Sequence, residues 1–203
     1  RQGGAVSPIT RGFRGRRRDA DRSRVPPGQY TVEDFPVLSA GPTPHRPLAA
    51  WSFSVDGAVD AGRMWTWEEF LALPQETFTV DIHCVTKWSK LDTRWTGVPV
   101  DALLQGITTD AAHVTAWCDG GYTTNVPLAD LTGGRAWVVH RFGDRPLDPE
   151  HGGPARLLVP HLYFWKSAKW VRGIELMAEE RPGFWEMYGY HIHGDPWKEE
   201  RYS

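Results

Sequence analysis

The chain has few cysteines and no long apolar run. Cys84 and Cys118 are the only cysteines among its 203 residues, which excludes the disulfide framework of a small secreted scaffold. No apolar stretch approaches the roughly 18 residues that a transmembrane helix needs, so we expect no membrane span. The length suits a single domain with its own hydrophobic core.

Positive charge is concentrated at the start of the chain. Residues 1–24 carry eight arginines and two aspartates, which leaves 15 basic and 23 acidic residues in the remainder. We interpret residues 1–29 as a basic, disordered arm. A nucleic-acid contact through this arm is the alternative, but the acidic remainder argues against it. Arg16-Arg17-Arg18 lacks the apolar stretch of an export signal, so we predict a cytoplasmic protein unless a signal lies upstream.

Short apolar runs separated by glycine and proline predict a mixed, strand-rich α+β domain with short helices. The spacing of Thr66 and Glu69 is that of a capping box and predicts a short helix. Pro99 and Pro127 are placed to begin two more. Strands are expected at residues 51–55, 78–84, 114–118, 122–126, 136–140, 156–159 and 171–176.

Cys84 ends one of these strand-like runs and enters a polar turn. Positive charge from His83 and Lys87 would lower the pKa of the thiol, and a thiolate is a nucleophile or a soft metal ligand. A buried structural cysteine is the alternative. Hydrolysis by a Cys84–His83 pair is disfavoured, because adjacent residues on a strand point to opposite faces.

Two further loops carry residues suited to binding or chemistry. The hairpin over residues 119–125 is polar and contains Tyr122. The segment from His151 to Trp170 combines glycines, Arg156, a serine and two lysines. Glycine lets the backbone approach a ligand closely, arginine binds phosphate bidentately, and lysine adds a point charge.

Taken together, these motifs resemble the molybdopterin-binding domain of the sulfite oxidase family. The resemblance covers about residues 30–180, which we assign to one domain, and residues 181–203 are expected to wrap over it as an aromatic and polar segment. The final segment is similar to that of short, haem-free bacterial members. The motifs that carry the resemblance are Cys84 within His-Cys-Val-Thr-x-Trp-Ser, Trp95-x-Gly97-Val98-Pro99, His151-Gly152-Gly153-Pro154-x-Arg156 and Lys166-Ser167-x-Lys169-Trp170.

The resemblance implies a molybdenum–molybdopterin cofactor without a nucleotide extension, and no haem. Cys84 stands at the position of the metal's protein ligand, and Tyr122 aligns with a tyrosine close to the metal. The remaining matched positions contact the pterin and its phosphate, and they are His151, Arg156, Lys166, Ser167 and Lys169.

This family points to two-electron oxygen-atom transfer on a small substrate, by S- or N-oxide reduction or by sulfite-like oxidation. Electrons would then be exchanged with a separate protein. The sulfite-oxidising branch uses an arginine of its N-terminal arm, whereas Leu38 aligns there and His45 and Arg46 lie close by, which puts sulfite in question. A non-catalytic molybdopterin carrier is the alternative function. His191 and His193 lack a third ligand, and we expect them to be surface residues rather than a metal site.

Overall fold

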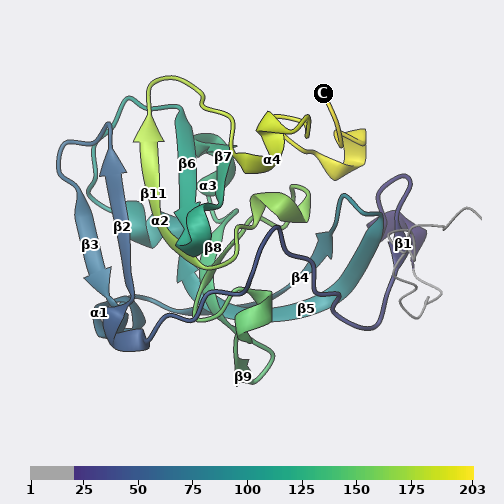
Figure 1. The fold of residues 1–203 in the computed structure, drawn as a ribbon, viewed down its shortest axis with the longest axis horizontal. Coiled ribbons are helices and arrows are strands. Elements are labelled where there is room, and N and C mark those ends of the chain that lie inside the picture. Colours follow the sequence, from purple (N-terminus) through teal and green to yellow (C-terminus); the bar gives the residue numbers. More distant parts are fainter. Residues whose placement is uncertain (1–20) are drawn as a thin grey trace, which may run out of the picture.

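Two β-sheets form the frame of the molecule (Figure 1). The structure is a computed structural model that describes residues 21–203. The predicted disorder of the arm therefore falls, for residues 1–20, outside the described residues. Residues 21–29 lie against the domain, where Arg24 forms a two-point ion pair with Asp81 at 2.6 and 2.9 Å.

The first sheet has five strands, and its two central strands come from distant parts of the sequence. β2 pairs in parallel with β11, whereas the other neighbours in this sheet are antiparallel. A strand close to the C-terminus, β11, thus lies beside β2 from the N-terminal half of the chain. In spatial order the strands are β3 (Arg63–Thr66), β2 (Ser52–Gly57), β11 (Val171–Met177), β6 (His113–Cys118) and β7 (Thr123–Pro127).

The second sheet is organised around the long strand β5 (Trp88–Pro99), which runs across the lower half of Figure 1. β5 pairs with β4 and β8 on its two sides and with the short β1 in parallel. The other strands are β1 (Tyr30–Thr31), β4 (Glu76–His83), β8 (Trp137–Phe142), β9 (Arg145–Pro146) and β10 (Arg156–Leu158).

The helices are short, as predicted. Thr66 and Glu69 form the expected capping box at the start of α1, with the Glu69 carboxylate accepting from the Thr66 amide at 2.8 Å. The four α-helices of residues 21–203 are α1 (Trp67–Ala72), α2 (Val100–Leu104), α3 (Leu128–Leu131) and α4 (Phe184–Met187). The strand-rich α+β fold is confirmed, and each predicted strand overlaps an observed one.

The buried apolar residues form two clusters. The larger one lies beneath the five-stranded sheet and includes Phe53, Phe70 and Ile174, all fully buried. The smaller one is dominated by aromatic rings, and it also contains Cys84 and Trp165. The thiol therefore lies at the edge of an aromatic core.

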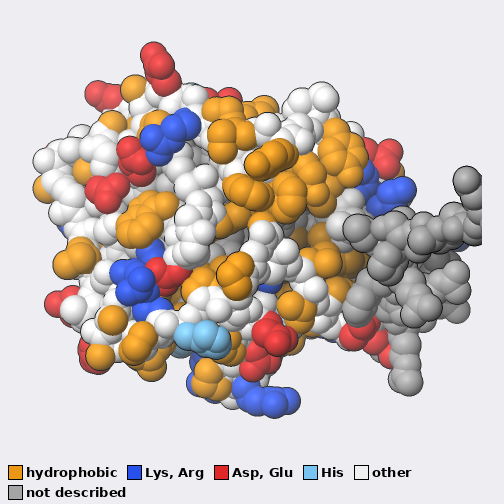
Figure 2. All heavy atoms as spheres, viewed as in Figure 1, with side chains coloured by type: hydrophobic (Ala, Val, Ile, Leu, Met, Phe, Trp, Pro, Cys, Tyr) orange, Lys and Arg blue, Asp and Glu red, His pale blue; other side chains and the backbone are white. Residues whose placement is uncertain are grey.

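The C-terminal segment lies over the second sheet. α4 and the segment that follows lie above the second sheet in Figure 1, and Tyr190 forms an isolated β-bridge with Tyr202. Figure 2 shows hydrophobic side chains gathered over this region, where Met187, Tyr188 and Tyr202 are 68%, 72% and 64% exposed. Within residues 21–203, no helix is long and apolar enough to cross a membrane.

Candidate active site

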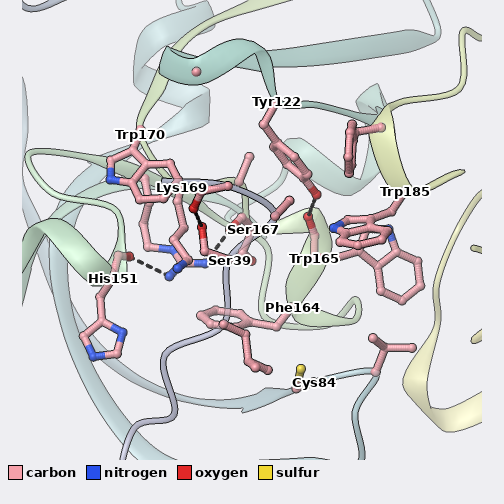
Figure 3. Close-up of a pocket in the computed structure, with 18 of the residues that line it drawn as sticks. Ser39, Cys84, Tyr122, His151, Phe164, Trp165, Ser167, Lys169, Trp170 and Trp185 are labelled. Carbon is pink, nitrogen blue, oxygen red and sulfur yellow. Dashed lines mark hydrogen bonds between the residues drawn. The ribbon is translucent and has the colours of Figure 1, made fainter. Parts of the chain in front are cut away.

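One cavity of about 430 Å³ brings together most of the residues singled out in the sequence (Figure 3). Its walls come from segments that are far apart in the chain. The loop after β4 supplies Cys84, and the turn after β6 supplies Asp119 and Tyr122. The loops around β10 supply His151, Arg156, Ser167 and Lys169. The remaining walls are residues 35–42 and aromatic rings of the C-terminal segment.

Cys84 follows the last residue of β4, and its side chain is 7% exposed. The Sγ atom lies 3.0 Å from the Thr86 hydroxyl. Burial raises the pKa of the Cys84 thiol, while the Thr86 hydrogen bonds and the nearby Arg201 and Arg156 lower it. His83 does not supply the positive charge that we expected, because burial lowers the pKa of His83 to about 4. The cationic neighbours of the thiol are thus two arginines that are distant in sequence.

The turn that carries the thiol is held from both ends of the described chain. Gln29 donates its side-chain amide to the carbonyls of Cys84 and Trp88, each at 3.0 Å. Arg201 donates to the Val85 carbonyl at 2.7 Å and to the Gln29 side-chain oxygen at 2.7 Å. These hydrogen bonds fix the backbone on which the sulfur sits.

Arg156 is a buried cation without a counter-ion. It is 1% exposed, and no salt bridge joins it to a carboxylate in the part of the chain that the structure describes. Its two terminal nitrogens donate to the carbonyls of His151, at 2.7 Å, and Ser167, while its Nε has no partner. The guanidinium lies 4.1 Å from the centre of the Phe164 ring. Burial lowers the pKa of Arg156 to about 9.

Lys169 adds a second cation beside Arg156, and the ring of His151, which is neutral at pH 7, lies next to both. Burial, followed by the charge of Arg156, lowers the pKa of Lys169 to about 8. The same two causes, with the charge of Lys169, lower the pKa of His151 to about 4. The His151 ring stacks on Phe35 at a centroid distance of 3.8 Å. A bound anion would relieve the repulsion between Arg156 and Lys169.

Ser167 and Gly152 shape the same end of the cavity. The Ser167 hydroxyl accepts a hydrogen bond from the Val159 amide at 2.8 Å, so its own hydrogen can be donated elsewhere. Gly152 has φ +111°, and a Cβ there would lie 3.0 Å from the Arg156 Cβ and from the Lys169 Cα. Glycine at this position therefore lets the loop lie against both basic residues.

Tyr122 lines the cavity from the other side. Its hydroxyl donates to the Trp165 carbonyl at 2.7 Å (Figure 3). Burial raises the pKa of Tyr122 well above its usual value, so the phenol stays protonated.

Lys166 is not brought to the cavity with the other predicted residues. Its side chain is fully buried and donates to the Glu186 carboxylate at 2.7 Å, the Asn125 carbonyl at 2.7 Å and the Ile192 carbonyl at 2.6 Å. The structure therefore places Lys166 in a buried ion pair that attaches α4 to the domain. The sequence could not reveal this, because Glu186 is 20 residues away.

Asp119 occupies the rim of the cavity between two arginines. Arg46 contacts both carboxylate oxygens at 2.7 Å, and Arg172 contacts one at 3.1 Å. Leu38 lines the cavity, whereas Arg46 does not. Arg46, the arginine close to the position where Leu38 aligns, is therefore paired with the Asp119 carboxylate.

Several lining residues were not predicted. Residues 35–42 form one wall, and Phe35 contacts four aromatic rings in addition to His151. This segment has no periodic pattern, and its prolines indicated only an irregular arm. Local sequence carried no signal for its position.

The remaining candidates lie outside the cavity. Cys118 is 6% exposed within the larger core and does not line the cavity. His193 lies between Asp130 and Glu200, at 2.9 and 3.1 Å. Among the described residues, no group of three or more His, Cys, Asp or Glu side chains is arranged to hold a metal. His191 and His193 therefore hold the C-terminal segment in place.

The fold and the cavity define an oxidoreductase domain built to carry a large anionic cofactor. The family model described as the oxidoreductase molybdopterin binding domain matches residues 40–185, and the chain belongs to this family. The sequence-based recognition and the assignment as a molybdopterin-dependent oxidoreductase are thereby confirmed.

The similar proteins agree with this assignment. The chain is 42% identical over 193 residues to the uncharacterized oxidoreductase YuiH of Bacillus subtilis (strain 168), covering 93% of this chain and 98% of YuiH. It is 26% identical to MsrP, the catalytic subunit of a protein-methionine-sulfoxide reductase from Pseudomonas syringae pv. tomato, covering 82% of this chain and 56% of MsrP.

A solved structure supports the fold. The sulfane dehydrogenase SoxCD from Paracoccus pantotrophus superposes with a TM-score of 0.60 at 19% identity, over 68% of this chain and 40% of that chain. At this identity the likeness concerns the fold alone.

The residues present fit a molybdopterin. A buried guanidinium with an unpartnered Nε, beside a lysine of lowered pKa, is suited to a phosphate. A soft thiol that lines the same cavity is suited to the metal.

Proposed function

We propose that the protein binds molybdenum–molybdopterin, without a nucleotide extension and without haem, and reduces a small S- or N-oxide. One observation carries this proposal. A single cavity holds a cysteine thiol together with a buried arginine that lacks a counter-ion. Cys84 would bind the metal, and Arg156 and Lys169, with His151 and Ser167, would bind the phosphate end of the pterin.

When bound, the molybdenum supplies two-electron exchange of an oxygen atom with the substrate. In the direction proposed, the substrate R₂SO takes two electrons and two protons and leaves as R₂S and water. In this proposal a separate electron-transfer protein supplies the electrons.

Tyr122 would orient the substrate oxygen. Its phenol is protonated, and the O–H now donated to the Trp165 carbonyl can turn about the C–O bond. A ligand oxygen that competes with this carbonyl would receive the hydrogen bond. Tyr122 would then act as a donor to the substrate and not as a base.

The walls of the cavity favour an uncharged, partly apolar substrate. Leu38, Phe164, Trp165, Trp170 and Trp185 all line it, and apolar walls with a few polar groups are typical of small-molecule sites. The relative MsrP is named for the reduction of protein methionine sulfoxide. A dialkyl sulfoxide is therefore the first substrate to test.

Replacement of Cys84 tests the proposal directly. Protein made in a host that synthesises molybdopterin is assayed with reduced methyl viologen and dimethyl sulfoxide or methionine sulfoxide. We expect Cys84→Ser to abolish turnover while the circular dichroism spectrum is unchanged, because the metal loses its protein thiolate. Cys118→Ala is the matched control, since it removes the other buried thiol, and it should keep both metal and turnover.

Full turnover by Cys84→Ser would overturn the assignment of the ligand. The alternative, a non-catalytic molybdopterin carrier, predicts stoichiometric pterin in the wild-type protein with no oxidation of reduced viologen by any oxide tested. The viologen assay, together with an analysis of metal and pterin content, therefore distinguishes an oxide reductase from a molybdopterin carrier.

A further inference from the structure

Asp119 is the single acidic residue among the described side chains that line the cavity. It begins the short turn that follows β6, and its side chain is 12% exposed. Both carboxylate oxygens are occupied. Arg46 approaches with two nitrogens at 2.7 Å each, and Arg172 adds a third contact at 3.1 Å.

Neither of these arginines lines the cavity. The carboxylate therefore stands between the cavity and two guanidinium groups. Arg172 has further acceptors, because it donates to the carbonyl and the hydroxyl of Ser52 at 2.8 and 3.0 Å. Within residues 21–203, the one other hydrogen bond of the Arg46 side chain goes to the Ala50 carbonyl at 3.3 Å. Arg46 is thus the cation whose position depends most on Asp119.

We infer that Asp119 is a specificity-determining residue that retains Arg46 in an ion pair at the rim and so keeps anionic substrates out of the cavity. The inference rests on the proposed function, since it takes this cavity as the substrate site. An oxyanion entering here would face the carboxylate and would have to compete with it for the same guanidinium. A two-point arginine–carboxylate pair is among the strongest hydrogen-bonded pairs in proteins, so this competition is unfavourable for the oxyanion.

An uncharged oxide does not meet this obstacle. It carries no net charge for Asp119 to repel, and it needs only a hydrogen-bond donor such as the Tyr122 hydroxyl. The ion pair thus selects by charge, whereas the aromatic walls select by size and polarity. Removing the carboxylate would leave Arg46 with one weak contact and would make a cation available at the rim.

The test measures binding of sulfate, which is inert to reduction under these conditions, to the molybdopterin-loaded protein. Loading keeps the Arg156 end of the cavity filled, so calorimetry reports on the rim. We expect Asp119→Ala and the isosteric Asp119→Asn to bind sulfate at least ~tenfold more tightly than the wild type, the factor that one added charge-assisted hydrogen bond provides. The double variant Asp119→Ala/Arg46→Ala should return to the wild-type value.

Asp144→Asn is the matched control, because Asp144 also pairs with an arginine, Arg94 at 2.5 Å, but is 91% exposed and does not line the cavity. It should bind sulfate as the wild type does. Unchanged sulfate binding in both Asp119 variants, with full molybdenum content, would overturn the inference. A gain that persists in the double variant would overturn the role of Arg46.

These outcomes are independent of turnover. If the Asp119 variants gain sulfate binding but no oxide is reduced, the role of Asp119 stands and the proposed reaction fails. If oxides are reduced and no variant gains sulfate binding, the proposed reaction stands and the role of Asp119 fails.

Discussion

Lys166 and Arg156 are both buried basic residues, but the surroundings of their charges differ. The Lys166 ammonium is fully buried against the Glu186 carboxylate and two backbone carbonyls. The Arg156 guanidinium is buried to the same degree, but its hydrogen bonds go to two backbone carbonyls and its Nε has no partner. Removing one partner of a buried ion pair destabilises the fold, whereas a buried cation without a counter-ion is a candidate for binding an anionic ligand.

The largest effect on stability is expected from Lys166→Met. The substitution leaves the Glu186 carboxylate, 1% exposed, without its cation, and breaking such a pair costs about 3–5 kcal/mol. Urea unfolding measures the loss. Lys198→Met is the control, because Lys198 is 67% exposed and 3.8 Å from Asp195, and exposed pairs contribute about 0–1 kcal/mol. Equal losses in the two variants would show that the Lys166 pair is not structural.

Arg156→Met should affect cofactor binding more than stability. Two backbone carbonyls lose a donor, so the cofactor-free protein loses about 1–3 kcal/mol, less than for Lys166→Met. Retention of molybdenum and pterin after dialysis should fall to background, because the phosphate loses its buried partner. Arg156→Lys keeps the charge with fewer donors, and we expect partial retention. Full retention of molybdenum and pterin by Arg156→Met would contradict the assignment of Arg156 to cofactor binding.

The smallest effect concerns pH. In the cofactor-free protein Lys169 has a pKa of about 8, below its ordinary value, because it is buried near Arg156. As pH rises above about 8 the lysine loses its proton, so affinity for the cofactor phosphate should fall by up to about tenfold per pH unit. Fluorescence titration with the pterin cofactor between pH 7 and 10 measures this, and Lys169→Met should flatten the profile.

The contribution of Lys169 to the stability of the cofactor-free protein should rise with pH, whereas affinity for the cofactor falls. The unfolded chain keeps the Lys169 proton up to its ordinary pKa, whereas the folded protein loses it near pH 8. The unfolded state therefore binds more protons between these values, and the Lys169 contribution to stability rises with pH across that window. A contribution that falls there, measured as the difference between wild type and Lys169→Met, would contradict the assigned shift.

Local signals in the sequence predicted the fold well. The Thr66–Glu69 capping box and the helix after Pro127 depend on neighbouring residues, and both were found at the expected positions. β5 (Trp88–Pro99) was not predicted. It contains Lys90, Asp92 and Arg94, and its central place in the sheet comes from partners that are distant in sequence.

Most of the residues that the motifs singled out lie together in the structure, while their roles stay predictions. Cys84, Tyr122, His151, Arg156, Ser167 and Lys169 line one cavity. Lys166 lies outside the cavity, paired with Glu186. The sequence did not indicate this position, because a lysine suited to phosphate and a lysine suited to a buried carboxylate have the same local sequence. Phe35 and Arg46 were not placed in the site, since their contacts with His151 and Asp119 depend on how an irregular segment crosses the domain. Cytoplasmic location and the domain limits stay predictions.

The hydrogen bonds of Gln29 and Arg201 have a practical consequence for handling the protein. Arg201 donates to the carbonyl of Val85, which is 116 residues away in sequence and directly follows Cys84. An affinity tag or a proteolytic cut close to residue 201 therefore acts on the backbone beside the thiol. Preparations that differ only in this region are not equivalent samples of the same site, and intact mass belongs with every measurement of metal content.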